Sequence, residues 1–318
     1  MMGPINQQLI DPQGRVIRKL RLSLTDRCNL RCRYCMPPDA EFLSSDRYLQ
    51  PNEYRDIVAE LAELGIQQVR LTGGEPLLRR EFPEIVTALA TIPTIELSLT
   101  TNGLLLEPHL SLLKNAGIHK LNISLDSLQA ATFHRITYGH ALERVLQAIA
   151  QAVQQGFQVK LNMVVMRGWN DHELVDMVAY GKQLGVEVRF LELMRVGYAC
   201  QLPQNAFISA QEMLARLQEH YQLTSIPSPR DSTAFRFRTS CGATIGFIAS
   251  ESQPFCGHCS RWRLSADGIL RACLFREGGI ALRGMNAQQR QQAYQQLLGM
   301  KPAVRGQTVS HAMYQIGG

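Results

Sequence analysis

Between residues 19 and 194 the chain repeats one unit, a short strand followed by a loop and an amphipathic helix. Gly65, Gly117, Gly156 and Gly185 stand where four of these helices should end, a position that favours left-handed backbone. Strand–helix units in series predict a parallel sheet with right-handed crossovers. The predicted strands are 19–24, 68–72, 96–101, 120–125, 158–165 and 187–193. The predicted helices are 52–64, 82–90, 108–116, 141–155 and 172–184.

Within these strands, polar residues alternate with apolar ones. Parallel strands covered by helices on both faces usually read as continuous apolar runs. Here the helices need the apolar face, so we expect the polar face to curve around a wet lumen. The sequence therefore predicts an α/β fold, an open, partial (β/α)6 TIM-like barrel, rather than a flat sheet with one solvent face. The polar-face residues are Arg21, Ser23, Arg70, Thr72, Ser98, Thr100, Asn122, Ser124, Lys160 and Asn162.

Three cysteines, Cys28, Cys32 and Cys35, follow the first predicted strand in a CxxxCxxC spacing. Catalytic groups of such barrels gather where strands end. Three soft thiolates in one tight loop fit an iron–sulfur cluster or zinc. No fourth cysteine follows nearby, so a cluster held here has one iron open to a small molecule. The alternative is a zinc knuckle completed from a distance, although zinc motifs usually run CxxC and come in pairs.

A second set of three cysteines lies beyond the repeating units. Cys256 and Cys259 form a CxxC pair, and thirteen residues separate Cys259 from Cys273. This spacing fits zinc as readily as an iron–sulfur cluster. Cys200 and Cys241 match neither set. We expect residues 1–195 to form the barrel and residues 196–318 an α+β extension that carries the second set.

Composition limits the remaining possibilities. The chain has 318 residues, 45% of them hydrophobic, and a net charge of +6. No apolar run is long enough to span a bilayer, and the first twelve residues lack a signal pattern. We therefore expect a cytoplasmic protein without a membrane or nucleic-acid partner, whose cysteines serve metal binding or catalysis. The mild positive charge suits an anionic ligand.

Taken together, these motifs resemble one known family. The first cysteine set with Tyr34 inside it, and Gly73-Gly74-Glu75-Pro76 after the second strand, resemble radical S-adenosylmethionine (SAM) enzymes. The second cysteine set, the segment Arg261-Trp262-Arg263 and the final Gly317-Gly318 narrow the resemblance to the GTP 3′,8-cyclase family of molybdenum cofactor biosynthesis.

The resemblance implies two 4Fe–4S clusters and SAM as cofactors. Its cluster ligands would be Cys28, Cys32, Cys35, Cys256, Cys259 and Cys273. Its SAM contacts would be Tyr34, Gly74, Ser124 and Met194. Its GTP contacts would be Arg21, Arg70, Thr100, Lys160, Arg261, Trp262 and Arg263. It further implies direct catalytic roles for the first three cysteines and for Arg261 and Arg263.

By the same resemblance, a 5′-deoxyadenosyl radical removes the C3′ hydrogen of GTP, and the sugar radical adds to guanine C8. The implied partners are an external electron donor, a downstream cyclic pyranopterin monophosphate synthase and a second copy of the chain in a homodimer. The alternatives are another two-cluster radical SAM enzyme acting on a peptide or RNA, and a non-catalytic zinc protein. We also expect the last residues to thread into the lumen, against the alternative of a frayed end.

Overall fold

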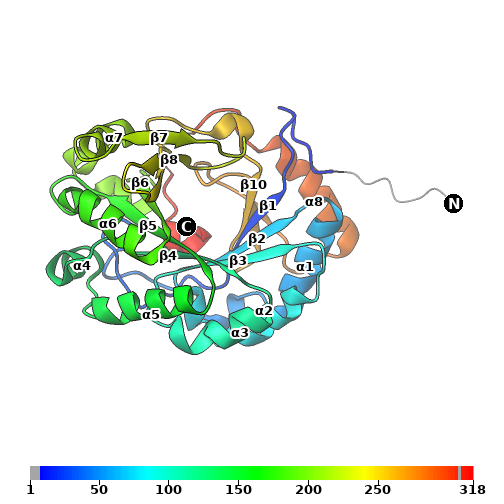
Figure 1. Cartoon of the computed structure of the whole chain (residues 1–318). Coiled ribbons are helices and arrows are strands. Elements are labelled where there is room, and N and C mark those ends of the chain that lie inside the picture. Colours follow the sequence, from blue (N-terminus) through cyan, green and yellow to red (C-terminus); the bar gives the residue numbers. More distant parts are fainter. Residues whose placement is uncertain (1–7, 307–308, 318) are drawn as a thin grey trace.

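The computed structural model describes residues 8–306 and 309–317. Its first six strands confirm the predicted repeat, with ends that agree to within one residue. They are β1 (Lys19–Ser23), β2 (Gln68–Thr72), β3 (Glu96–Thr101), β4 (Lys120–Ser124), β5 (Gln158–Val165) and β6 (Glu187–Glu192). Each pairs in parallel with the next along the chain. The sheet curves around a central space, as Figure 1 shows.

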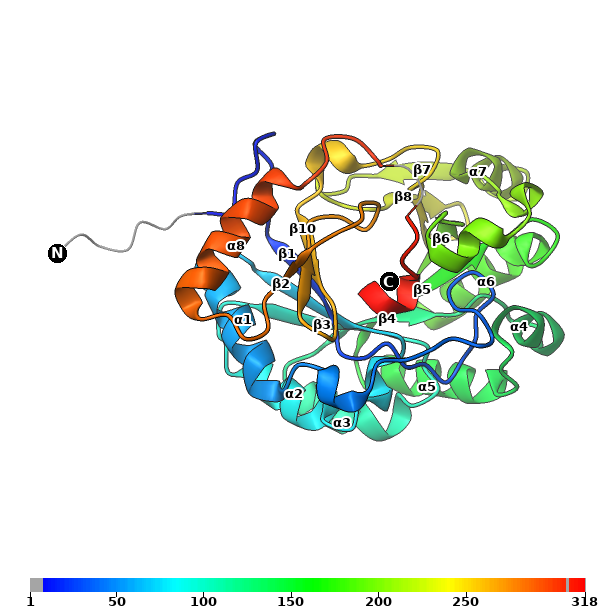
Figure 2. The ribbon, with the colours of Figure 1, turned by 180° about the vertical axis from the view of Figure 1, so that it is seen from behind.

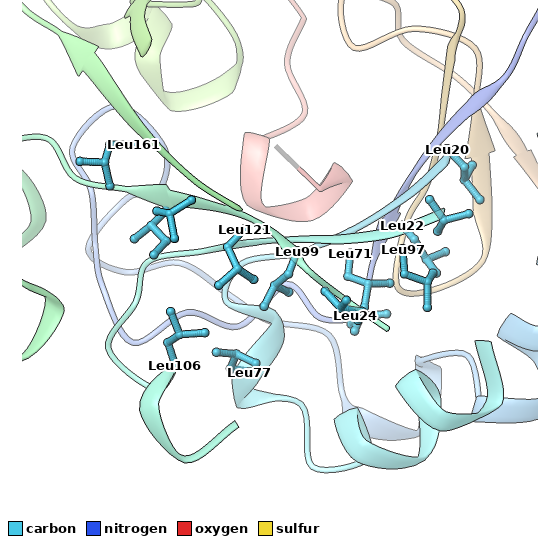
Figure 3. Packing of buried hydrophobic residues seen from close by; sticks show 14 of the residues in the cluster. Leu20, Leu22, Leu24, Leu71, Leu77, Leu97, Leu99, Leu106, Leu121 and Leu161 are labelled. Carbon is cyan, nitrogen blue, oxygen red and sulfur yellow. The ribbon is translucent and has the colours of Figure 1, made fainter. Parts of the chain in front are cut away.

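The helices lie on the outer, convex side of the sheet (Figure 1). They are α1 (Pro51–Glu63), α2 (Phe82–Ala90), α3 (Leu110–Asn115), α4 (Ala130–Thr137), α5 (Leu142–Gln154) and α6 (Leu174–Leu184). The apolar strand residues face them and are buried, including Leu71, Leu99 and Leu121. Figure 3 shows these leucines on one side of the sheet and the C-terminal helix on the other. The alternation therefore separates a hydrophobic core from a polar lumen, which confirms the predicted partial barrel.

The C-terminal extension completes the same sheet at both of its edges. Its strands are β7 (Leu223–Ile226), β8 (Phe235–Thr239), β9 (Thr244–Ile248), β10 (Arg261–Leu264), β11 (Ile269–Arg271) and β12 (Ile280–Ala281). Strand β10 pairs in parallel with β1, and β9 pairs in parallel with β6. The full order is β12-β11-β10-β1-β2-β3-β4-β5-β6-β9-β8-β7. Strands separated widely in the sequence therefore enclose one lumen together.

Three further helices belong to the extension: α7 (Ala210–Gln218), α8 (Ala287–Gly299) and α9 (Met313–Ile316). Helix α8 lies beside α1, and the end of the chain returns to the middle of the barrel, as the reverse view in Figure 2 shows. In the described part of the chain, no helix combines the length and apolar character that a membrane crossing needs.

Candidate active site

The loop with the first cysteine set is fastened to the turn that follows β2. The backbone N–H of Gly74 donates to the Thr25 carbonyl at 2.7 Å, and that of Glu75 donates to the Arg27 carbonyl at 2.7 Å. A Cβ atom on Gly74 would lie 2.2 Å from the Arg27 carbonyl oxygen. Only glycine permits this approach, so Gly74 holds the cysteine loop as well as bordering the cavity.

The first three cysteines are half-buried, and few positive charges compensate their sulfurs. Burial, with a smaller contribution from Glu75, raises the pKa of Cys28 to about 11. Burial, with Cys28 next to it, raises the pKa of Cys35 to about 12. The Cys28 sulfur accepts from the Leu30 N–H at 3.4 Å and the Asn102 amide at 3.7 Å. Positive iron would supply the charge that keeps these sulfurs ionised.

Cations lie closer to the second cysteine set than to the first. Burial opposes ionisation of Cys259, but Arg261 and Lys301 outweigh it and lower the pKa of Cys259 to about 6. The Lys301 ammonium donates to the Cys259 sulfur at 3.4 Å. The Cys273 sulfur accepts from the Phe275 N–H at 3.3 Å. The surroundings of Cys259 therefore stabilise its thiolate, whereas burial raises the pKa of Cys256.

Both cysteine sets face one cavity in the lumen, bordered by Cys28, Cys32, Cys35, Cys256, Cys259 and Cys273. Within residues 8–306 and 309–317, no three Cys, His, Asp or Glu side chains are grouped so that they could hold a single metal ion. In a multi-iron cluster each iron takes one protein thiolate, so the sulfurs stand farther apart than around one ion. Each set offers three soft thiolates, the donors that iron–sulfur clusters take.

Arginines crowd the same cavity. Arg21, Arg70, Arg261 and Arg263 all border it. Burial and the neighbouring cation Arg189 lower the pKa of Arg70 to about 10, and burial lowers the pKa of Arg263 to about 10. Among the ion pairs of the described residues, none joins these four arginines to a carboxylate. Such a group is complementary to a multiply charged anion.

Acidic groups also border the cavity, but backbone N–H groups engage them. The Glu75 carboxylate accepts from the Asn102 N–H and the Thr101 hydroxyl, each at 2.7 Å. Asp126 accepts from the Val164 N–H at 2.9 Å and from the Tyr34 hydroxyl at 2.7 Å. These carboxylates fix strand ends and orient Tyr34, so they leave the arginines uncompensated.

Several buried polar atoms at the cavity have no partner among the described residues. They are Thr72 Oγ1, Asn162 Oδ1, Ser250 Oγ and Arg261 Nη2. A buried polar atom without a hydrogen bond is costly. Their grouping around one space indicates a polar ligand.

The structure brings most of the predicted site residues to this cavity. Besides the six cysteines and four arginines, it is bordered by Tyr34, Gly74, Thr100, Ser124 and Met194. It is also bordered by residues that the sequence did not single out as ligands: Asn102, Asp126, Asn162, Arg189, Ser250 and Phe255. Asn162 lies on the predicted polar face, and Asp126 directly follows a strand. The alternation of polar and apolar residues could therefore have indicated Asn162, and its position after a strand could have indicated Asp126.

Two predicted substrate contacts lie elsewhere. Trp262 is fully buried in the hydrophobic core, where its ring lies 6.5 Å from that of Tyr294. It points away from the lumen because it stands between two lumen-facing arginines on one strand. Lys160 does not border the cavity; its ammonium lies 3.2 Å from the Glu187 carboxylate. The structure therefore places Trp262 in the core and away from this cavity.

The end of the chain lies inside the barrel. Helix α9 leads to Gly317, whose carbonyl oxygen accepts a hydrogen bond from Arg263 Nη1. Gly317 has φ +71°, and a Cβ there would lie 2.5 Å from Thr72 Oγ1 and 3.0 Å from Ser23 Cβ. The tail therefore contacts the polar face through a residue without a side chain. Gly318 lies outside the described residues.

A parallel partial barrel with a three-cysteine loop after β1 is the arrangement of radical SAM enzymes. The family model "Radical SAM superfamily" matches residues 22–181, and "Molybdenum Cofactor Synthesis C" matches residues 186–310. The crystal structure of Streptococcus suis SuiB bound to precursor peptide SuiA has a TM-score of 0.66, with 11% identity over 85% of this chain and 63% of that one. At that identity the likeness concerns the fold alone.

Curated relatives define the family more narrowly. GTP 3′,8-cyclase of Synechocystis sp. is 56% identical over 99% of this chain and 96% of its own. GTP 3′,8-cyclase of Aquifex aeolicus is 40% identical over 86% of this chain and 87% of its own. This chain belongs to the GTP 3′,8-cyclase family. Membership in this radical SAM family includes a 4Fe–4S cluster and SAM as cofactors.

Proposed function

We propose that this chain converts GTP to 3′,8-cyclo-7,8-dihydro-GTP, the first step of molybdopterin biosynthesis. The observation that carries the proposal is one cavity bordered by both cysteine sets and by Arg21, Arg70, Arg261 and Arg263. The arginines have no carboxylate partners among the described residues, so a triphosphate would supply the missing negative charge.

In this proposal Cys28, Cys32 and Cys35 hold the cluster that binds SAM. The SAM contacts are Tyr34, Gly74, Ser124 and Met194, which border the cavity beside that loop. Asp126 accepts the hydrogen bond of the Tyr34 hydroxyl and so fixes the orientation of its ring. When bound there, SAM would supply a 5′-deoxyadenosyl radical for removal of the C3′ hydrogen of GTP.

Cys256, Cys259 and Cys273 hold a second 4Fe–4S cluster in this proposal, close to the guanine. Arg21, Arg70, Thr100, Arg261 and Arg263 bind GTP, and their placement around the lumen sets which sugar carbon meets the radical. Lys160 joins them if the phosphates draw its ammonium away from Glu187. The tail inserted beside Arg263 narrows access of water to the lumen.

Further partners belong to the same proposal. An external donor supplies one electron for SAM cleavage and a second that, with a proton, reduces the nucleotide radical left after addition to C8. A downstream cyclic pyranopterin monophosphate synthase consumes the product. We also propose a homodimer. In this proposal residues 1–195 bind SAM and the first cluster, and residues 196–318 hold the second cluster.

The test is an anaerobic reaction of the reconstituted chain with GTP, SAM and a reductant, followed by chromatography and mass analysis of the nucleotides. We expect a new isomer of GTP together with 5′-deoxyadenosine and methionine. Formation of 5′-deoxyadenosine without any change in GTP would instead support a peptide or RNA substrate. A colourless protein that holds zinc would refute the enzymatic reading.

A further inference from the structure

Lys301 is a buried lysine whose surroundings are unusual. It is only 3% exposed, and its ammonium has three acceptors: the Cys259 sulfur at 3.4 Å, the Arg261 carbonyl at 2.8 Å and the Ala272 carbonyl at 3.0 Å. These contacts use all three of its N–H donors. A buried ammonium is costly unless it is hydrogen-bonded and paired with negative charge.

Among the described residues, no carboxylate forms an ion pair with Lys301. The negative charge within its reach is that of the second cysteine set, because its ammonium contacts the Cys259 sulfur directly. Lys301 is therefore placed as the counter-ion of these sulfurs rather than of an acidic side chain.

The two carbonyl contacts of Lys301 join the segments that carry the cysteines. Arg261 follows Cys259 by two residues on β10, and Ala272 directly precedes Cys273. One ammonium thus spans both segments and sets the separation of two of the three sulfurs. The same contact holds the strand from which Arg261 reaches the cavity.

A second buried cation, Arg15, supports this arrangement from the N-terminal side. Its guanidinium donates to the Cys256 carbonyl at 2.8 Å and the Pro302 carbonyl at 2.9 Å, and it also reaches the Lys301 carbonyl at 3.3 Å. Asp11 lies 2.6 Å from Arg15 and fixes the orientation of the guanidinium. Through these contacts Arg15 joins the Cys256 end of the CxxC segment to the backbone at Lys301 and Pro302.

We infer that Lys301 is a positioning residue for the second cysteine set, with Arg15 as its support, and that its charge favours the reduced state of the group held there. The inference rests on the proposed second 4Fe–4S cluster. Hydrogen bonds to cluster sulfurs and nearby charge are among the factors that set a cluster's reduction potential. A positive charge at a sulfur stabilises the added electron, so its removal should lower the potential.

The experiment compares the wild-type chain with Lys301→Met after anaerobic reconstitution. Iron and acid-labile sulfide are counted, and the potential of each cluster is followed by redox titration with electron paramagnetic resonance. We expect Lys301→Met to keep the iron of the first cluster and to lose part of the second. In the fraction that keeps its second cluster, the equilibrium constant for reduction of that cluster should fall at least tenfold, which lowers its potential by about 59 mV for one electron.

Arg290→Met is the matched control, because Arg290 is a cation of the same extension that pairs with Glu60 and touches no cysteine. It should leave both iron content and potentials unchanged. Arg15→Met should reduce loading of the second cluster. If Lys301→Met does not fold, Lys301→Gln, which keeps N–H donors but lacks the charge, takes its place with the same expected fall in potential.

The possible results separate this inference from the proposed function. If the wild-type chain carries iron for two clusters and Lys301→Met has the same content and potentials, Lys301 is a structural lysine and the inference fails while the second cluster stands. If the wild-type chain carries iron for one cluster only, and Cys259→Ser has the same iron content, the assignment of a second cluster is wrong and the inference fails with it.

Discussion

Gly317→Ala should displace the end of the chain from the barrel without unfolding the protein. The backbone of Gly317 has φ +71°, which costs an alanine roughly 1–2 kcal/mol. A Cβ there would also lie 3.0 Å from Ser23 Cβ and 2.5 Å from Thr72 Oγ1. The first contact involves an atom fixed to the backbone, so the neighbour cannot rotate away and the tail must move.

Moving the tail breaks the hydrogen bond from Arg263 to the Gly317 carbonyl. A hydrogen bond from a charged donor contributes about 1.5–3 kcal/mol. This bond opposes the displacement in the wild type and the variant alike, so the substitution itself disfavours the inserted tail by the backbone cost of about 1–2 kcal/mol, roughly a 5- to 30-fold change in population, together with the clash at Ser23 Cβ. Since only the end of the chain moves, the fold and both cysteine sets should remain intact.

The assay measures product formation by enzyme with verified cluster content, together with hydrogen exchange of the amides near Gly317. We expect a steep fall in conversion of GTP, faster exchange in the tail, and little change in the thermal midpoint. Gly299→Ala is the control, because nothing lies within 4 Å of a Cβ there and the residue ends a helix. Full turnover with unchanged exchange in Gly317→Ala would refute the reasoning.

Three further predictions concern other parts of the molecule. Cys32→Ser should abolish SAM cleavage while Cys259→Ser retains some; equal loss in two folded variants would contradict separate roles. Lys160→Ala should weaken GTP binding more than guanosine binding. The difference is at most about 1.5–3 kcal/mol, reduced by the energy needed to separate Lys160 from Glu187. Equal weakening for both ligands would place Lys160 away from the phosphates. Burial opposes ionisation of Asp231, but Lys19 outweighs it and lowers the pKa of Asp231 to about 2, so its stabilisation is complete above the unfolded pKa near 4 and lost as pH falls toward 2. Asp231→Asn should therefore lower the free energy of unfolding, measured in urea, by about 1 kcal/mol at pH 7, allowing for solvent screening, and by less at pH 3. A difference between wild type and variant that does not change with pH would contradict a stabilising ion pair at Asp231.

The sequence predicted the barrel because each strand carries its own evidence, the alternation of polar and apolar residues. It missed α4, at whose end Tyr138, and not the glycine that follows it, takes the left-handed conformation, with φ 57°. It also missed the parallel pairing of β10 with β1. Pairing between strands so far apart in the chain depends on the folded arrangement and leaves no local pattern.

The same distinction applies to the candidate site. The cysteine sets and the strand arginines were found from local spacing, and the structure gathers them at one cavity. Trp262 was misplaced although alternation with its two arginine neighbours predicts that it faces the core. The pairing of Lys160 with Glu187 and the contacts of Lys301 join residues from separate segments, and no motif records them.

The central claim is that the lumen presents C3′ of GTP to the radical derived from SAM. The most direct measurement uses GTP carrying deuterium at C3′ in a single anaerobic reaction with SAM and a reductant, followed by mass analysis of 5′-deoxyadenosine and of the nucleotide product. The account predicts that 5′-deoxyadenosine gains one deuterium and that the cyclised product has lost it. Cyclised product that forms while the deuterium stays on the nucleotide, with unlabelled 5′-deoxyadenosine, would contradict it.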